Sequence, residues 1–255
     1  MTEEAGGPKL LLELRGIDVR FKNNIVETLQ GIDLSISAGE SIGIVGPSGC
    51  GKSTLLRVVA GLLSESAGQR ILHEQEIANP GRIAMVFQDA RLLPWRTVLS
   101  NMAIPFELVN QPVNREKIEW LLNKTGISPA DYEKYPRQLS GGMKMRVAVA
   151  RSLLLDPELL LLDEPFAAVD DFLREQLNDE LIGWQQEFGF ATVLVTHHLG
   201  EAVFLSQKIL LMSAHPGQIV EEVAIPWSTR NETLRESSEY VALVAGIKHR
   251  LREKQ

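Results

Sequence analysis

Residues 46–54 read GPSGCGKST and fit the pattern G-x-x-x-x-G-K-[S/T], a glycine-rich loop that needs a particular structural setting. An apolar run at 42–45 predicts a buried strand before the loop, and a helical pattern follows it, with Leu55, Val59 and Leu62 on one face. The glycines let backbone amides converge on an anion, and the helix amino terminus adds unpaired N–H groups and a positive dipole end. The segment therefore predicts a phosphate-binding loop within an α/β fold.

The residue types in this loop indicate the chemistry of its ligand. The Lys52 side chain can reach the β- and γ-phosphates of a nucleotide, and the Ser53 hydroxyl can bind Mg²⁺. We expect the whole loop to contact the nucleotide, through Gly46, Pro47, Ser48, Gly49, Cys50, Gly51, Lys52, Ser53 and Thr54.

Two acidic residues directly follow the leucine run at 159–162, which predicts a strand buried on both faces. In open α/β sheets, ligands bind beyond the carboxyl ends of the strands, where Asp163 and Glu164 would lie. Asp163 can hold Mg²⁺ directly or through water, and Glu164 is placed to polarise an attacking water. On their own, two solvated acids in a loop would be an equally good interpretation. The phosphate loop favours the metal-binding and catalytic roles.

A second helix end of the anion-binding type follows Leu139. Ser140 is a natural N-cap, and the glycines at 141 and 142 leave the helix amides open. A capped structural helix is the simpler interpretation. However, a chain with a complete phosphate loop does not need a second helix end for the same phosphate. The surplus suggests that the Ser140 end serves a nucleotide held by another copy of the chain.

The remaining patterns predict an α/β body with a helical insertion. Alternating residues predict antiparallel strands at 17–21 and 32–36, and apolar runs predict buried strands at 83–87, 191–195 and 209–212. From about 91 to 155, prolines separate helical stretches and no strand pattern appears, which predicts an inserted helical subdomain. We expect a disordered start at 1–9, a main domain at 10–230 and a helical tail at 231–255.

Composition narrows the class of protein. The chain carries 26 basic and 33 acidic residues, a net charge of −7, and this argues against a nucleic-acid partner, which usually requires a basic surplus. Its single cysteine cannot form an internal disulfide, which suits a reducing compartment. No apolar run approaches the roughly 20 residues that span a bilayer, and the start of the sequence is not a signal peptide.

Together these motifs resemble the ATP-binding subunit of an ATP-binding cassette (ABC) importer, and the resemblance runs from about residue 12 to 226. In it, Phe21 corresponds to the aromatic residue that stacks on adenine, and Gln88 to the Q-loop glutamine. Residues 139–143 correspond to the signature motif. Asp170 corresponds to the D-loop aspartate, and His197 to the switch histidine. The segments FQ…LLPW and DEPF look most like the nitrate, sulfonate and taurine importer group.

The resemblance implies a P-loop NTPase of the ABC ATPase fold, with an antiparallel β subdomain and an inserted α-helical subdomain. It implies ATP and Mg²⁺ as cofactors, with Ser53, Gln88 and Asp163 around the metal. Lys52, Glu164 and His197 would be catalytic, and Ser140, Gly141, Gly142, Asp163 and Asp170 would also contact nucleotide. Two copies would close head to tail around two ATP molecules. The dimer would sit on the cytoplasmic face of the membrane and drive solute uptake through permease subunits, indirectly with a substrate-binding protein.

The sequence departs from the family at a few positions. Met143 replaces the usual glutamine of the signature motif, and His198 stands where an acid usually follows the switch histidine. Trp95 is either a core aromatic residue or a contact with the membrane subunit. Three other functions remain open at this point: a soluble ABC-type ATPase outside transport, a silent module that senses ATP, and an exporter of the same fold. The solute itself cannot be inferred from the sequence.

Overall fold

The structure, a computed structural model, describes residues 9–21, 26–73, 81–167 and 169–253. Residues 1–8 of the expected disordered start lie outside this part. The centre of the molecule is a six-stranded sheet in the order β5-β6-β7-β3-β8-β9. All neighbouring strands in it are parallel except β9, which pairs antiparallel with β8. The strands are β3 (Ser41–Val45), β5 (Ile83–Phe87), β6 (Leu159–Asp163), β7 (Ala191–Val195), β8 (Lys208–Met212) and β9 (Ile219–Ala224).

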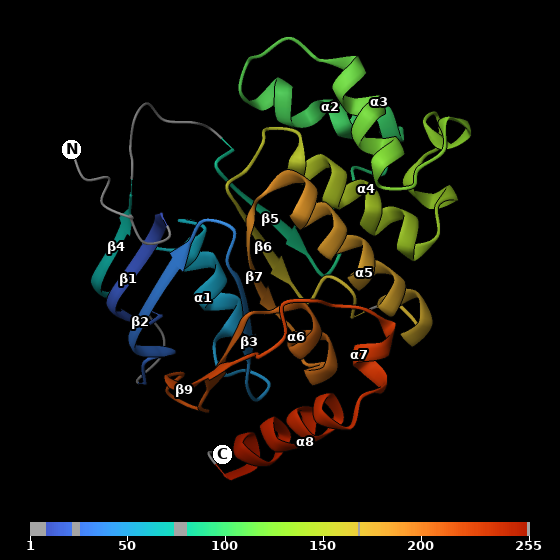
Figure 1. The fold of residues 1–255 in the computed structure, drawn as a ribbon. Coiled ribbons are helices and arrows are strands. Elements are labelled where there is room, and N and C mark those ends of the chain that lie inside the picture. Colours follow the sequence, from blue (N-terminus) through green and yellow to red (C-terminus); the bar gives the residue numbers. More distant parts are fainter. Residues whose placement is uncertain (1–8, 22–25, 74–80, 168, 254–255) are drawn as a thin grey trace, which may run out of the picture.

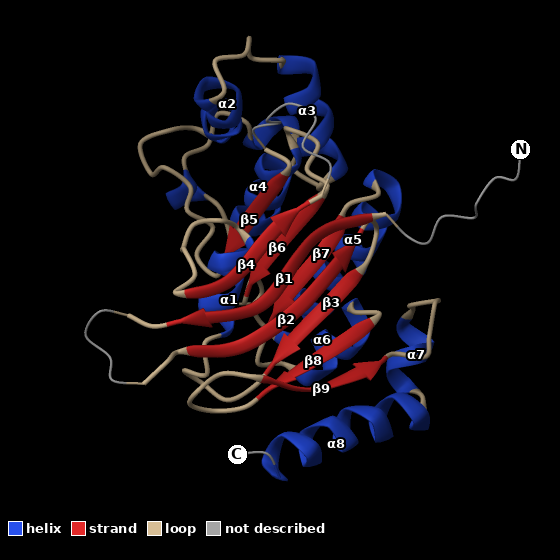
Figure 2. Cartoon of the chain, turned by 90° about the vertical axis from the view of Figure 1, so that its left-hand side faces the viewer, coloured by secondary structure: helices blue, strands red, loops and turns tan. Residues whose placement is uncertain are grey.

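A second, antiparallel sheet covers one side of the molecule (Figure 2) and has the order β2-β1-β4. Its strands are β1 (Leu10–Val19), β2 (Leu29–Ser37) and β4 (Ala67–Leu72). Buried residues of β1 and β2 share one apolar cluster with α1 (Lys52–Val59) and with one face of the central sheet. In Figure 1, α1 accordingly lies between the two sheets.

The other helices lie on the opposite face of the central sheet or beyond its ends (Figure 1). Along β6, Leu159 and Leu161 join the cluster with α1, whereas Leu160 and Leu162 join the cluster with these helices. Within 91–155 the described elements are all helical. The helices are α2 (Val98–Leu108), α3 (Arg115–Lys124), η1 (Pro129–Asp131), η2 (Pro136–Gln138), α4 (Gly141–Leu153), α5 (Asp171–Phe188), α6 (Leu199–Leu205), α7 (Glu232–Glu236) and α8 (Ser238–Glu253).

Two expectations about local structure were wrong. The helix after the phosphate loop ends at Val59, so Leu62 lies outside it and is 65% exposed rather than on a buried face. Gly61 explains this end, because its φ of +71° is a left-handed conformation that cannot continue a right-handed helix. The first strand ends at Val19, so Phe21 is not part of it.

The register of the central sheet determines where the chemical groups meet. Phe87 pairs with Asp163, Asp163 with Val195, and Val195 with Ile44. Because these strands are parallel, the segments that follow them all leave the sheet at one edge. Gln88, Glu164, Thr196 and Gly46 are therefore brought to one edge from four separate parts of the chain.

Candidate functional site

The phosphate loop opens onto a cavity of about 460 Å³ at this edge of the sheet. Gly51 precedes α1 with a φ of +101°, a backbone conformation that residues other than glycine rarely adopt. The loop thereby turns sharply into the helix, and the first helical N–H groups face the cavity. The residues that line it are Thr28, Gly46, Ser48, Gly49, Gly51, Lys52, Ser53, Thr54, Glu164 and His197.

Lys52 supplies a positive charge to this cavity. Its side chain is buried, and its ammonium group donates hydrogen bonds to the carbonyl oxygens of Gly46 at 2.9 Å and Pro47 at 2.8 Å. These acceptors are neutral, and in the described part of the chain no carboxylate pairs with the ammonium. The charge is thus available to an anion in the loop.

Ser53 and Asp163 bring two oxygen donors together. The Ser53 hydroxyl, in the first turn of α1, donates a 2.7 Å hydrogen bond to Oδ1 of Asp163, the last residue of β6. A hydroxyl and a carboxylate are hard oxygen ligands of the type that Mg²⁺ prefers. The described residues contain no cluster of three or more His, Cys, Asp or Glu that could hold a metal by themselves. This pair fits an ion that takes its other ligands from phosphates and water.

Glu164 and His197 lie next to each other in the cavity lining. Nδ1 of His197 lies 3.1 Å from Oε2 of Glu164, and the two side chains are 52% and 27% exposed respectively. The Glu164 backbone has a φ of +49°, a sparsely populated conformation for a residue with a side chain. Its N–H is held by the carbonyl of Val195 at 2.8 Å. The strained backbone therefore fixes a carboxylate next to the phosphate loop.

The histidine loop after β7 is held by groups that the sequence reasoning missed. Thr196 is buried, accepts a 3.0 Å hydrogen bond from the His198 N–H, and is hydrogen-bonded to Glu201. Burial raises the pKa of the Glu201 carboxyl, and the bond from Thr196 opposes this shift. In the sequence, a lone acid in the apolar stretch EAVFL was the only available signal for Glu201.

Several predicted site residues do not line the cavity. Phe21 and Gln88 are exposed and follow β1 and β5 respectively. Cys50 is buried, and burial raises the pKa of its thiol. Pro47 is not in the lining either, and its carbonyl accepts a hydrogen bond from Lys52, which does line the cavity.

Ser140 and Asp170 lie at a second face, where two helix amino termini meet. Ser140 caps α4 by accepting a bond from the Met143 N–H at 3.2 Å, and Asp170 caps α5 by accepting one from the Leu173 N–H at 3.0 Å. A Cβ on Gly142 would come within 2.8 Å of the Leu173 side chain, so the two helix ends are in direct contact. This face contains Ser140, Gly141, Gly142 and Asp170, none of which lines the phosphate cavity.

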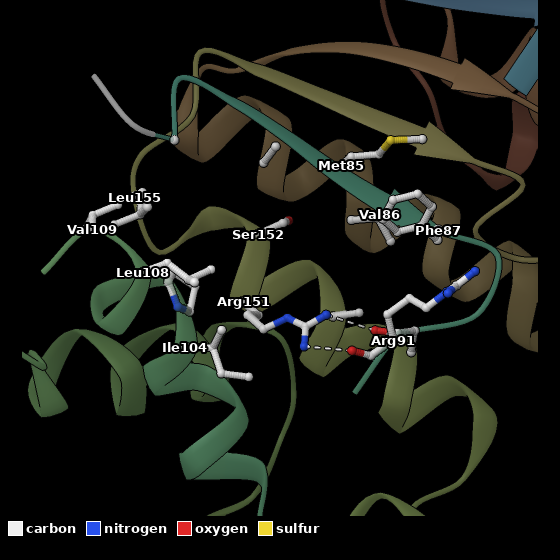
Figure 3. Close-up of a pocket in the computed structure, with 15 residues that line it drawn as sticks. Met85, Val86, Phe87, Arg91, Ile104, Leu108, Val109, Arg151, Ser152 and Leu155 are labelled. Atoms are coloured by element: carbon white, nitrogen blue, oxygen red, sulfur yellow. Dashed lines mark hydrogen bonds between the residues drawn. The ribbon is translucent and has the colours of Figure 1, made fainter. Parts of the chain in front are cut away.

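A separate apolar cavity of about 510 Å³ lies between β5 and the helices α2 and α4 (Figure 3). Phe87, Ile104, Leu108 and Leu155 contribute to its walls. Arg151 crosses it and donates hydrogen bonds to the carbonyls of Ala90 and Arg91, both at 3.0 Å. Trp95, in the connection to α2, is 71% exposed, which excludes the core interpretation of this residue. Among the helices described, none has the length and apolar character that a bilayer crossing requires.

The sequence is similar to that of known ATP-binding proteins of transporters. The family model described as "ABC transporter" matches residues 29–167. The aliphatic sulfonates import ATP-binding protein SsuB of Bacillus licheniformis is 43% identical over 78% of this chain and 76% of its own length. The taurine import ATP-binding protein TauB of Yersinia pestis is 41% identical over 86% of each chain.

A solved structure shows the same arrangement of elements. The ATP-binding cassette MJ0796, solved as a dimer in a post-hydrolysis state with ADP and Pi, matches with a TM-score of 0.73 and 26% identity. The match covers 85% of this chain and all of that one.

Proposed function

The chain belongs to the ABC transporter family of ATP-binding proteins and is an ATPase, and we propose that it powers the import of a small sulfonate-type solute through partner membrane subunits. The predicted fold class, an ABC ATPase fold, is confirmed by the structural match. One observation above all supports the proposal: the ends of three strands, β3, β6 and β7, bring together the phosphate loop, the Ser53–Asp163 pair and the Glu164–His197 pair. This complete set disfavours a module that only senses ATP.

The loop and Lys52 would bind the triphosphate of ATP. Its oxygens would replace the Gly46 and Pro47 carbonyls as partners of the Lys52 ammonium, because an anion accepts a stronger hydrogen bond from a cation than a carbonyl does. The loop amides and Lys52 would then neutralise the charge that develops on the transferred phosphoryl group. Ser53 and Asp163 would hold Mg²⁺ with Gln88 nearby, and the bound ion supplies further charge neutralisation at the phosphates.

Glu164 and His197 would act on the attacking water. The Glu164 carboxylate would orient the water and accept its proton, a role that requires a rigidly placed base. His197, already within hydrogen-bond distance of Glu164, would contact the γ-phosphate. Phe21, which does not line the phosphate cavity, would stack on the adenine ring.

The face with Ser140 and Asp170 would complete the site in a second copy of the chain. Its residues do not line the phosphate cavity of their own chain, yet the α4 amino terminus provides a further anion-binding helix end. We propose a head-to-tail dimer in which each ATP lies between the phosphate loop of one copy and the Ser140 face of the other.

The apolar cavity beside β5 would receive a segment of the membrane subunit and hold the chain at the cytoplasmic face of the membrane. Phe87 lines this cavity and directly precedes Gln88. A movement of Gln88 on loss of the γ-phosphate would therefore be transmitted to the docked segment through Phe87. The exposed Trp95 would extend the contact. A substrate-binding protein would deliver the solute. The sulfonate class is proposed because SsuB and TauB are named for sulfonate and taurine import.

The substitution Glu164→Gln tests the proposed catalytic role. It keeps the shape of the side chain and removes the base, so ATP should bind while phosphate release falls by about 100-fold or more. The ATP-bound dimer should then persist, and small-angle scattering should show a doubled mass only with ATP. Glu187→Gln, an exposed glutamate of α5, is the matched control. Wild-type hydrolysis in the Glu164→Gln protein would refute the assignment.

A further inference from the structure

Arg174, in the first turn of α5, links two loops that flank the phosphate cavity. Its guanidinium donates to the Val169 carbonyl at 2.9 Å and to the Phe166 carbonyl at 3.4 Å. Both carbonyls belong to the segment that joins Glu164 to Asp170. The side chain is only 12% exposed and also pairs with Asp171 at 2.5 Å. Arg174 therefore braces the chain between the proposed catalytic base and the proposed dimer contact.

The same guanidinium reaches the histidine loop. Nη1 of Arg174 lies 3.5 Å from Nδ1 of His198, and the His198 ring lies 4.1 Å from the His197 ring, measured between centroids. The His198 backbone is fixed by Thr196, which Glu201 in turn holds. A guanidinium has only N–H donors, so the attractive arrangement is a neutral imidazole that accepts at Nδ1.

The surroundings of His198 favour that neutral form. Burial lowers the pKa of His198, and electrostatic interaction with the Arg174 guanidinium and the His197 ring lowers it further. Asp171 and Glu164 act in the opposite direction, and the net shift is downward. His198 thus stays an acceptor at neutral pH, and it loses this ability once the ring is protonated.

We propose that Arg174 and His198 form a positioning pair that couples the loop carrying Glu164 and Asp170 to the loop carrying His197. Neither side chain lines the phosphate cavity, so the pair acts through the residues it holds. The inference rests on the proposed roles of Glu164 and His197. An imidazole accepts a hydrogen bond only while it is neutral, and this makes the link sensitive to protons.

The pair predicts a defect in turnover with little change in nucleotide binding. Arg174→Ala should lower the kcat of the full-length chain by about tenfold or more, because a small displacement of the reacting groups is costly. Equilibrium binding of ATP should change less than about twofold. Arg174→Lys keeps the positive charge but replaces the planar guanidinium, which donates in several fixed directions, with a single ammonium group. It should therefore not restore kcat. Arg115→Ala, at an exposed arginine of α3, is the matched control.

The pH profile separates a positioning role from a merely structural one. His198→Ala should lower kcat, and His198→Asp should rescue it, because a carboxylate accepts from Arg174 at every pH in the assay. Over about pH 5.5 to 8.5, the acid-side fall of kcat should move to lower pH in His198→Asp than in the wild type. Asparagine also accepts a hydrogen bond and does not titrate, so His198→Asn should show the same shift of the acid-side fall to lower pH. It provides the test if the aspartate variant fails to fold.

Two outcomes would overturn the inference: a wild-type kcat in both Arg174 variants, or an acid-side fall that is unchanged in both His198→Asp and His198→Asn. The proposed function fails by a different result, which is wild-type protein without phosphate release or a Glu164→Gln variant that still turns over. The two failures are therefore distinguishable in one set of assays.

Discussion

At the scale of single residues, Glu201 is a carboxyl group in an unusual position. It is 5% exposed, one of its oxygens is bonded to Thr196, and the other has no hydrogen-bond partner among the described residues. Burial raises its pKa above the usual value of 4.5. The folded protein therefore binds this proton more tightly than the unfolded chain does. The resulting stabilisation is complete below pH 4.5 and is lost as the pH rises through the raised pKa.

We expect Glu201→Gln to remove this dependence, because an amide does not titrate. The free energy of unfolding of the wild type, relative to the variant, should be largest near the usual carboxyl pKa and should fall towards neutral pH. Urea unfolding at a series of pH values measures the difference. Glu222→Gln, at an exposed position of β9, should give a difference that does not vary in this way. A constant gap between wild type and Glu201→Gln would contradict the expectation.

Some residues that position the site could not be predicted from the sequence. Lys52 and Glu164 could be selected because each sits in a motif with a known chemical logic, and His197 could be selected through the family resemblance. Arg174, Thr196 and Glu201 could not, because their contacts join α5, β7 and α6, and these contacts exist only in the folded chain. The sequence likewise predicted Gln88 at the site, although the structure places it at the same sheet edge but outside the cavity lining.

At the scale of elements, α8 shows how one helix attaches to the body. Ile247 is fully buried, and the Tyr240 hydroxyl donates a 2.6 Å hydrogen bond to the Gly200 carbonyl in α6. Burial raises the pKa of Tyr240 to about 12, so the phenol remains a donor. Val241, the next residue along the helix, is 58% exposed.

Ile247→Ala should therefore destabilise the protein by about 2–5 kcal/mol, the cost of removing a fully buried aliphatic side chain. Val241→Ala on the same helix should change stability by at most about 0.5 kcal/mol. Denaturant midpoints followed by circular dichroism compare the two variants. Equal losses in both would mean that α8 does not dock as the structure shows.

The periodicity of the sequence predicted α8 well and β4 not at all. Tyr240, Val244, Ile247 and Leu251 recur at helical spacing, and all four pack on the core. In β4 the first three residues are exposed and the last three only partly buried, so no alternation of apolar and polar residues marks the strand. Its place is set by pairing with β1, a contact between distant segments that a local pattern does not contain.

At the scale of the whole molecule, the two anion-binding helix ends are separated. The α1 end faces the phosphate cavity, and the α4 end lies on the face shared with Asp170. The sequence suggested such a division only through the surplus of a second glycine-flanked helix start. If the face with Ser140 completes the site of a second copy, then a substitution there should leave ATP binding by a single chain intact. It should prevent two chains from closing around ATP.

The substitution Ser140→Asp tests ATP binding by one chain separately from ATP-dependent dimer formation. Aspartate keeps a capping oxygen for α4, so stability should change by less than about 1 kcal/mol. Its negative charge would oppose the γ-phosphate held by another copy. In the Glu164→Gln background, ATP affinity at low protein concentration should be unchanged, whereas scattering should no longer detect the ATP-dependent dimer. Ser128→Asp, at the exposed cap of η1, should leave the dimer intact. A Ser140→Asp dimer as stable as its parent would place the second half of the site elsewhere on the molecule.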